Sequence, residues 1–138
     1  MYLNISGPVF SIITPFNKKE RIDYRSLRKL IKFYYNRGAR IFYLMPFNSR
    51  LGLLNETEII ELNSNLIKFV KNLDKNNIVI TSERYEGSTF ETIQTINNFF
   101  DRGADINAII FGEKFYSNEQ VINHFKTINK KSNGPLLL

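Results

Sequence analysis

The chain lacks cysteine entirely and has a single histidine, His124, among its 138 residues. Without thiols it can form no disulfide, no thiolate zinc site and no cysteine nucleophile. One imidazole argues against a histidine-rich metal site and against a Ser-His-Asp triad. No glycine-rich loop follows any apolar run, which argues against dinucleotide and Walker-type nucleotide sites. We therefore predict neither a metal nor a cofactor.

Long apolar runs are also missing. None approaches the ~18 residues that a membrane span needs, and the first eight residues show no basic region followed by an apolar stretch, as a signal peptide would. The hydrophobic content of 43% is nevertheless sufficient for a core in one domain. We expect residues 1–138 to belong to one domain of a soluble cytoplasmic protein without a membrane partner.

Positive charge exceeds negative charge, with 19 Lys and Arg against 13 Asp and Glu. The lysines are scattered, with Lys18, Lys32, Lys71, Lys114 and Lys130 in five different segments. A nucleic-acid footprint needs basic residues concentrated on one face. The pattern therefore favours a solvated basic surface, and we predict no nucleic-acid partner.

Short apolar runs alternate with segments of helical periodicity. The expected strands are residues 9–13, 41–45, 78–81, 108–111 and 136–138. The amphipathic segments between them open near Asp23, Asn55, Ser88 and Ser117, and the last three begin with capping boxes. Alternation of this kind, with strands apolar throughout, indicates a parallel sheet with helical crossovers.

A weak internal repeat favours a barrel over a doubly wound sheet. Residues 36–41 (Asn-Arg-Gly-Ala-Arg-Ile) resemble residues 101–106 (Asp-Arg-Gly-Ala-Asp-Ile), two strand–helix units later. In each copy we expect the glycine to end a helix and the isoleucine to open a strand. Four units and a fifth strand are about half of an eight-unit barrel, which needs ~250 residues. The predicted fold is α/β, a partial (β/α)8 TIM barrel, whose first and fifth strands are edges that something else must cover.

Several motifs occur in a fixed order along the chain: Thr14-Pro15-Phe16, Leu54–Glu58, Gly87-Ser88-Thr89, Gly103-Ala104-Asp105 and Gly134-Pro135-Leu136. Together they resemble the dihydrodipicolinate synthase / N-acetylneuraminate lyase family, which are pyruvate-dependent class I aldolases on a (β/α)8 barrel. The resemblance covers residues 8–138 but only the N-terminal half of the family's length. Both the synthase branch and the sialic acid lyase branch stay open.

The resemblance implies a site for a substrate carboxylate after the second strand. Where the family has Gly-Thr-Thr-Gly-Glu, this chain has Pro-Phe-Asn-Ser-Arg at residues 46–50. The candidate substrate-binding residues are therefore Phe47, Asn48 and Ser49. Phe47 has no hydroxyl, and Asn48 can donate to a carboxylate but cannot pass on a proton as a hydroxyl does. Ser49 keeps a hydroxyl one position later, and Arg50 reverses the charge of the family's Glu.

Catalysis in this family needs a lysine amine that forms a Schiff base with the keto group of pyruvate. The resemblance places this lysine on the sixth strand and an active-site tyrosine on the fifth, both beyond Leu138. We predict no catalytic residue in this chain and interpret Lys114 as a solvated loop residue beside Glu113. The chain is expected to be a truncated family member, inactive alone, whose parent reaction makes or breaks a carbon–carbon bond of pyruvate or a related keto acid.

Two alternative functions are also open for this chain. The chain could be a non-catalytic half barrel that self-associates or docks on a full-length relative through its open edges. It could also be an anion-binding module that uses Arg50 and Arg84. The expected partners are accordingly a keto acid and either a homo-oligomer or a complementary half barrel.

Overall fold

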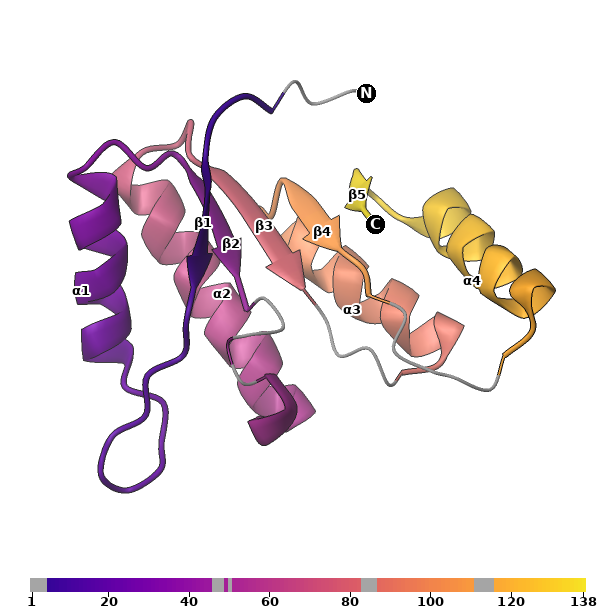
Figure 1. Ribbon diagram of the computed structural model, residues 1–138, viewed down its shortest axis with the longest axis horizontal. Helices are drawn as coiled ribbons and strands as arrows, with labels where there is room; N and C mark the ends of the chain where they lie inside the picture. The colour runs from indigo at the N-terminus through magenta and orange to yellow at the C-terminus, as the bar shows by residue number, and fades with distance from the viewer. Residues whose placement is uncertain (1–4, 46–48, 50, 83–86, 111–115) are drawn as a thin grey trace.

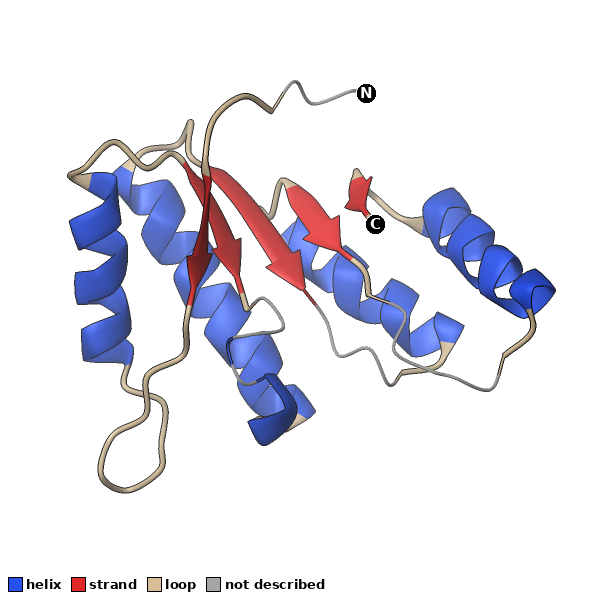
Figure 2. Cartoon of the chain, in the orientation of Figure 1, coloured by secondary structure: helices blue, strands red, loops and turns tan. Residues whose placement is uncertain are grey.

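A computed structural model describes residues 5–45, 49, 51–82, 87–110 and 116–138. Strands and helices alternate along the chain (Figures 1 and 2). The elements are β1 (Val9–Ile12), α1 (Tyr24–Tyr35), β2 (Ile41–Leu44), the short 3-10 helix η2 (Leu51–Leu53), α2 (Glu56–Leu73), β3 (Ile78–Ser82), α3 (Thr89–Asp101), β4 (Ile106–Ala108), α4 (Asn118–Lys131) and β5 (Leu136–Leu137). None of the described helices is long and apolar enough to cross a membrane.

The five strands form one parallel sheet in the order β1-β2-β3-β4-β5. Every strand pairs with its neighbour in the sequence, and the four α-helices lie along one side of the curved sheet (Figure 2). This is the predicted arrangement of consecutive strand–helix units in one half of a TIM barrel. We call the helix-covered side the outer face and the opposite side the inner face.

The outer face carries the main core. Phe42, Leu44 and Val79 of the sheet pack against buried residues of α1 and α2. The helical stripes that fill this core have the spacing expected from the sequence: Leu27, Ile31, Ile59, Leu62, Leu66, Ile67 and Val70. A smaller cluster of Ile96, Ile109 and Ile128 joins α3 and α4 to the sheet.

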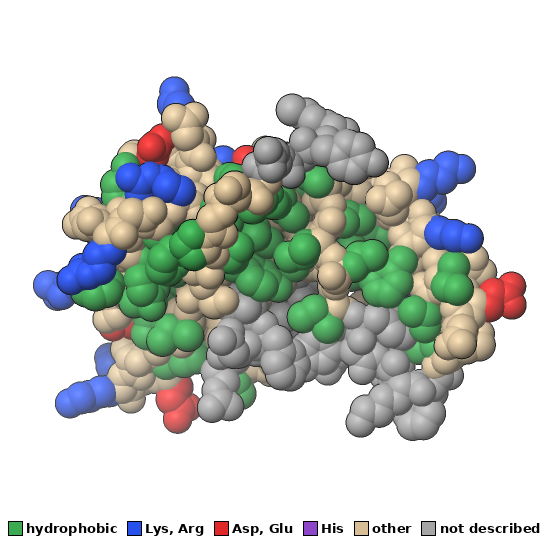
Figure 3. Space-filling view, turned by 45° about the horizontal axis from the view of Figure 1, so that its top comes forward, with side chains coloured by type: hydrophobic (Ala, Val, Ile, Leu, Met, Phe, Trp, Pro, Cys, Tyr) green, Lys and Arg blue, Asp and Glu red, His purple; other side chains and the backbone are tan. Residues whose placement is uncertain are grey.

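The inner face is apolar and has no layer of described residues over it. Ile41, Ile80, Ile106 and Ala108 form its centre. Toward the two edge strands its side chains become accessible, with Leu137 of β5 47% exposed. Figure 3 shows hydrophobic side chains gathered across the middle of the molecule. The open edges expected of a half barrel are therefore present.

The internal repeat is reproduced hydrogen bond by hydrogen bond. Gly38 and Gly103 adopt φ values of +93° and +100°, the left-handed conformation that ends a helix and suits glycine. Their N–H groups donate to the carbonyls of Tyr35 (3.0 Å) and Phe100 (2.9 Å). The next strands begin three residues later, at Ile41 and Ile106. Both predictions drawn from the repeat are confirmed.

The fourth strand lies earlier than predicted. It covers Ile106–Ala108 rather than residues 108–111, of which residue 111 lies outside the described part. The apolar run alone misplaced this strand because a polar residue, Asn107, interrupts it, whereas the repeat placed its start correctly at Ile106. In the structure its amide is buried and satisfied, since the Thr81 hydroxyl donates to Asn107 Oδ1 at 2.8 Å. Small differences of one residue occur at the ends of the first, second, third and fifth strands.

Candidate functional site

The carboxyl ends of all five strands lie at one edge of the sheet, where the arrowheads point in Figure 1. In parallel barrels this edge carries the active site, because the loops that follow the strands converge there. The loop regions after β2, β3 and β4 begin at this edge. Of the predicted site residues, Phe47 and Asn48 lie outside the described residues, as do Arg50, Arg84, Glu113 and Lys114.

Ser49 is the one predicted substrate-binding residue that the structure describes. Its side chain is fully buried, with 0% exposure. Its Oγ has no hydrogen-bond partner among the described residues. A buried hydroxyl without a partner costs about 1–3 kcal/mol, so such a group is a candidate for contact with a ligand.

Met45 directs the chain out of β2 toward this region. It has a φ of +55°, which is uncommon for a residue other than glycine, and it is 1% exposed. Asn63 of α2 holds it from the outer side, because Asn63 Nδ2 donates to Met45 Sδ at 3.2 Å and to Ile59 O at 3.0 Å. Helix α2 therefore fixes where the segment after β2 starts.

Ser82, the last residue of β3, is a second buried hydroxyl that the sequence analysis missed. It is 2% exposed, and its Oγ is also without a hydrogen-bond partner among the described residues. Side chains alternate along a strand, so Ser82 lies on the same side as Ile78 and Ile80, which pack on the inner face. The sequence signal that could have identified Ser82 is its spacing: it is a polar residue two positions after Ile80, and residues two apart in a strand lie on the same face.

His124 lies apart from the strand ends, on α4. Its Nδ1 is 2.8 Å from the Thr89 hydroxyl of α3, and burial lowers its pKa. The ring packs at an angle of 76° to that of Phe125. Within the described ranges, no group of three or more His, Asp and Glu side chains is placed to hold a metal ion.

Comparison with known proteins identifies the barrel. The model of the Dihydrodipicolinate synthetase family matches residues 4–138. The chain belongs to this family. A curated relative, the 4-hydroxy-tetrahydrodipicolinate synthase of Karelsulcia muelleri (strain GWSS), is 30% identical over 140 residues, which is 98% of this chain and 45% of that protein.

Solved structures of the dihydrodipicolinate synthetase family show the same arrangement of strands and helices. The dihydrodipicolinate synthase of Acinetobacter baumannii, solved in complex with pyruvate, superposes with a TM-score of 0.84 at 25% identity, over 96% of this chain and 45% of that one. The enzyme from Oceanobacillus iheyensis gives 0.82 at 17% identity over 93% and 42% of the two chains. The chain therefore spans a little under half the length of these relatives.

Proposed function

We propose that this chain supplies the first four strand–helix units of a lyase-type barrel that acts on pyruvate or a related keto acid. The family membership supports this proposal, as do the names of the relatives and the pyruvate held by the A. baumannii enzyme. The observation that carries it is the buried Ser49 hydroxyl after β2, which has no hydrogen-bond partner in the described part of the chain and lies where the family resemblance expects a carboxylate to bind.

The chemistry would be divided between this chain and residues outside it. A lysine amine condenses with the keto carbon of pyruvate and releases water. The resulting iminium accepts the electron pair when a carbon–carbon bond is broken. In the opposite direction the iminium loses a proton from the adjacent carbon, and the enamine so formed donates the electron pair to the new bond. The resemblance places that lysine beyond residue 138. This chain would bind and orient the acid, with Ser49 and Asn48 as donors to the carboxylate and Phe47 as an apolar wall.

The inner face and the two edge strands are proposed to bind the C-terminal half of such a barrel. Val9 of β1 and Leu137 of β5 are each 47% exposed, and their backbones lie at the two margins of the sheet. Exposed apolar edge strands need a partner, and closing the barrel would pair both edges at once. The closed barrel is further proposed to be cytoplasmic and homo-oligomeric.

The similarity does not favour the alternative of a non-catalytic, self-associating half barrel. Nearly the whole chain aligns with relatives that are named as synthases, over a little under half of their length. Loss of catalysis is therefore not required to explain any described feature.

Borohydride trapping with pyruvate tests the proposal. The chain is examined alone and after assembly with the C-terminal half of a dihydrodipicolinate synthase, and each polypeptide is weighed by mass spectrometry. We expect an adduct only in the assembly and only on the lysine of the added half. An adduct on this chain alone, or none in a correctly assembled barrel, contradicts the proposal.

A further inference from the structure

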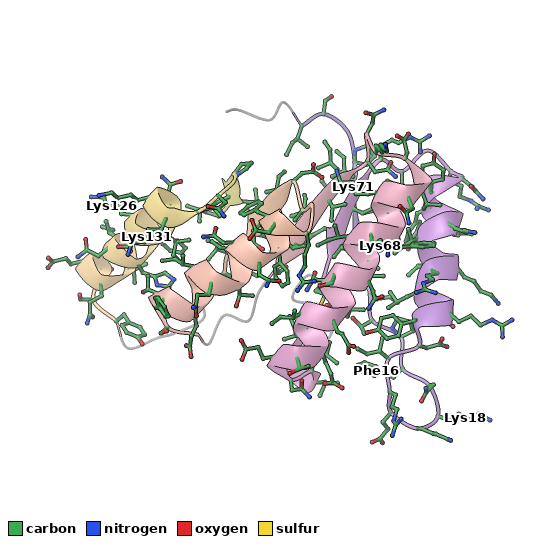
Figure 4. All side chains as sticks on the ribbon, turned by 180° about the vertical axis from the view of Figure 1, so that it is seen from behind. Phe16, Lys18, Lys68, Lys71, Lys126 and Lys131 are labelled. Atoms are coloured by element: carbon green, nitrogen blue, oxygen red, sulfur yellow. The ribbon has the colours of Figure 1, made fainter. Side chains whose placement is uncertain are left out.

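We propose that a groove between helices α1 and α2 binds a small anion that carries a chain of phosphate groups. The two helices lie side by side in the outer layer (Figure 4), so this site does not depend on the function proposed for the strand ends. The groove has a volume of about 300 Å3 and is lined by Arg25, Arg28, Lys29, Lys32 and Phe69.

The four basic side chains form one stripe along α1. Their positions, 25, 28, 29 and 32, have the spacing that brings side chains to the same side of a helix. Helix α1 contains no Asp or Glu among its 12 residues, so each member of the stripe has two cationic neighbours and no anionic one within the helix. Like charges at this spacing destabilise a helix, and Arg25 in the first turn also opposes the helix dipole. All four side chains are exposed, so burial in the core does not explain the arrangement.

The described part of the chain supplies no counter-charge to this stripe. None of its four side chains forms an ion pair within 4.0 Å, or a hydrogen bond, with another described residue. The N-cap carboxylate of Asp23 instead accepts from the N–H and the hydroxyl of Ser26, at 3.0 and 2.7 Å. Burial and the charges of Glu61 and Glu58 raise the pKa of Tyr24, so these two carboxylates lie toward the start of α1. Neither lines the groove, whose positive charge is left for a ligand to balance.

Phe69 of α2 gives the groove a fixed apolar wall. Its ring is half-buried and packs against the main core. The guanidinium carbon of Arg28 lies 5.8 Å from the centre of this ring, within the range of cation–π attraction. A guanidinium held over an aromatic face has lost part of its conformational freedom before a ligand arrives, which lowers the entropic cost of binding.

The size and charge of the groove together select the ligand class. Its volume is at the lower end of the range for small-molecule sites, so a fitting ligand must carry several negative charges in little space. Each phosphate group carries about −1.5 to −2 charges at pH 7 and oxygens that accept from Arg and Lys. Two or three linked phosphates therefore balance the stripe, whereas a single carboxylate leaves most of it unbalanced. A long nucleic-acid strand would leave most of its phosphates outside a groove confined to one helix pair.

Calorimetric titration of this chain with sodium tripolyphosphate and with ATP tests the proposal. The variant Arg28→Gln/Lys32→Gln removes two charges that are one helical turn apart in the groove, and Gln keeps a high helix propensity. The matched control is Lys126→Gln/Lys130→Gln, which removes the same charge at the same spacing from α4. Figure 4 labels Lys126, at the other end of the molecule from α1.

We expect Arg28→Gln/Lys32→Gln to weaken tripolyphosphate binding about tenfold or more, because charge-assisted hydrogen bonds are lost. The control should weaken it less than about twofold, since distant exposed charges are screened by salt. Added salt should weaken binding more in the unmodified chain than in the groove variant. Without ligand, the groove variant should melt no lower than the unmodified chain, because repulsion along α1 is relieved. A purely structural role for the pair would instead lower the melting temperature.

The two ligands distinguish the two sources of phosphate. Tighter binding of ATP assigns the groove to a nucleotide, and equal or tighter binding of tripolyphosphate assigns it to an inorganic polyphosphate; both support the phosphate site. Equal weakening by the two double variants would show attraction to the net charge of the chain alone and would overturn the proposal. It is also overturned if neither phosphate compound binds, if citrate binds as tightly as tripolyphosphate, or if binding is confined to single-stranded RNA.

Discussion

At the scale of single residues, an ion pair at the amino ends of β3 and β4 explains part of the Gly103-Ala104-Asp105 motif. Lys71 Nζ of α2 lies 2.6 Å from Asp105 Oδ2 and also donates to Asn77 O at 2.8 Å (Figure 4, which labels Lys71). The same carboxylate oxygen accepts from the Val79 N–H at 2.7 Å. Asp105 therefore ties helix α2 to two strands at the edge opposite the candidate site.

Replacing Asp105 by Ala should lower the free energy of unfolding by about 2 kcal/mol, because the Val79 N–H and the Lys71 ammonium both lose their acceptor. Urea unfolding followed by circular dichroism measures the loss. Asp101→Ala, an exposed carboxylate near the end of α3, is the control and should change stability little. A loss as small in Asp105→Ala as in the control would show that the ion pair is not structurally important.

Gly134 is required because of its close approach to an aromatic ring. A Cβ built at this position would lie 2.6 Å from Cε1 of Phe100. Gly134→Ala should therefore cost about 1–3 kcal/mol through overpacking, and Phe100→Leu in the same chain should recover part of this. Gly52→Ala, where no atom lies within 4 Å, is the control. Melting temperatures of the wild type, the Gly134→Ala and Phe100→Leu single variants, the double variant and the Gly52→Ala control give the comparison. Strict additivity in the double variant would contradict the steric explanation.

At the scale of elements, three of the helices begin with capping boxes that differ in one chemical respect. In α3 the Ser88 N–H donates to Glu91 Oε2 at 2.9 Å, and in α4 the Ser117 N–H donates to Gln120 Oε1 at 2.8 Å. The hydrogen bonds from Ser88 lower the pKa of Glu91. The cap of α3 therefore titrates, whereas the neutral cap of α4 does not.

Of these two helices, acidification should weaken the cap of α3 and leave the cap of α4 unchanged. Because the folded pKa of Glu91 is below its unfolded value, its stabilising contribution is complete above the unfolded pKa and is lost as the pH falls through the folded one. The amide proton of Ser88 should shift in NMR spectra over this acidic range, and that of Ser117 should not. Equal shifts at both caps would contradict the assignment. Glu91→Gln should remove the shift at Ser88.

The elements themselves were largely predictable because their signals are local. The N-caps Asn55, Ser88 and Ser117 and the stop at Gly103 depend on residues within one turn, and all are confirmed. Buried polar residues were not predictable. Asn107 is hidden inside β4 because its partner Thr81 comes from another strand. Such a pairing exists only after the sheet has formed.

The candidate site also contains one residue that could be predicted from local sequence and one that could not. Ser49 could be proposed because it lies within a contiguous motif. Ser82 could not, since its hydroxyl is significant only through its burial beside β2 and β4. A polar residue at the end of an apolar strand reads equally well as the first residue of a loop.

At the scale of the whole molecule, the dominant feature is a sheet with one covered face and two free edges. The inner face holds the proposed contact with a C-terminal half barrel. Leu137 on β5 is a margin residue whose side chain is accessible, whereas the centre of the same face is buried. A charge at this margin would have to be desolvated on assembly, at a large cost in free energy.

Leu137→Lys should therefore weaken assembly with the C-terminal half at least tenfold, while the melting temperature of the chain alone changes by only a few degrees. Analytical ultracentrifugation of the mixture measures the assembly. Phe90→Lys is the matched control, since Phe90 is an apolar side chain that is 66% exposed on helix α3 of the outer layer. Equal weakening by the two variants, or none by Leu137→Lys, would exclude this margin from the interface.

The order of the sheet also bears on how the protein is made. Each strand pairs with the one synthesised just before it, so no segment has to wait for a distant partner. Most of the largest cluster of buried side chains among the described residues comes from the segment between β1 and the end of α2, which is synthesised before the rest of this chain, and Val79, Phe99 and Ala104 join it later. Folding can then proceed one strand–helix unit at a time, because each new strand pairs with a strand that has already formed. The most recently formed strand is then the edge of the sheet to which the next strand adds.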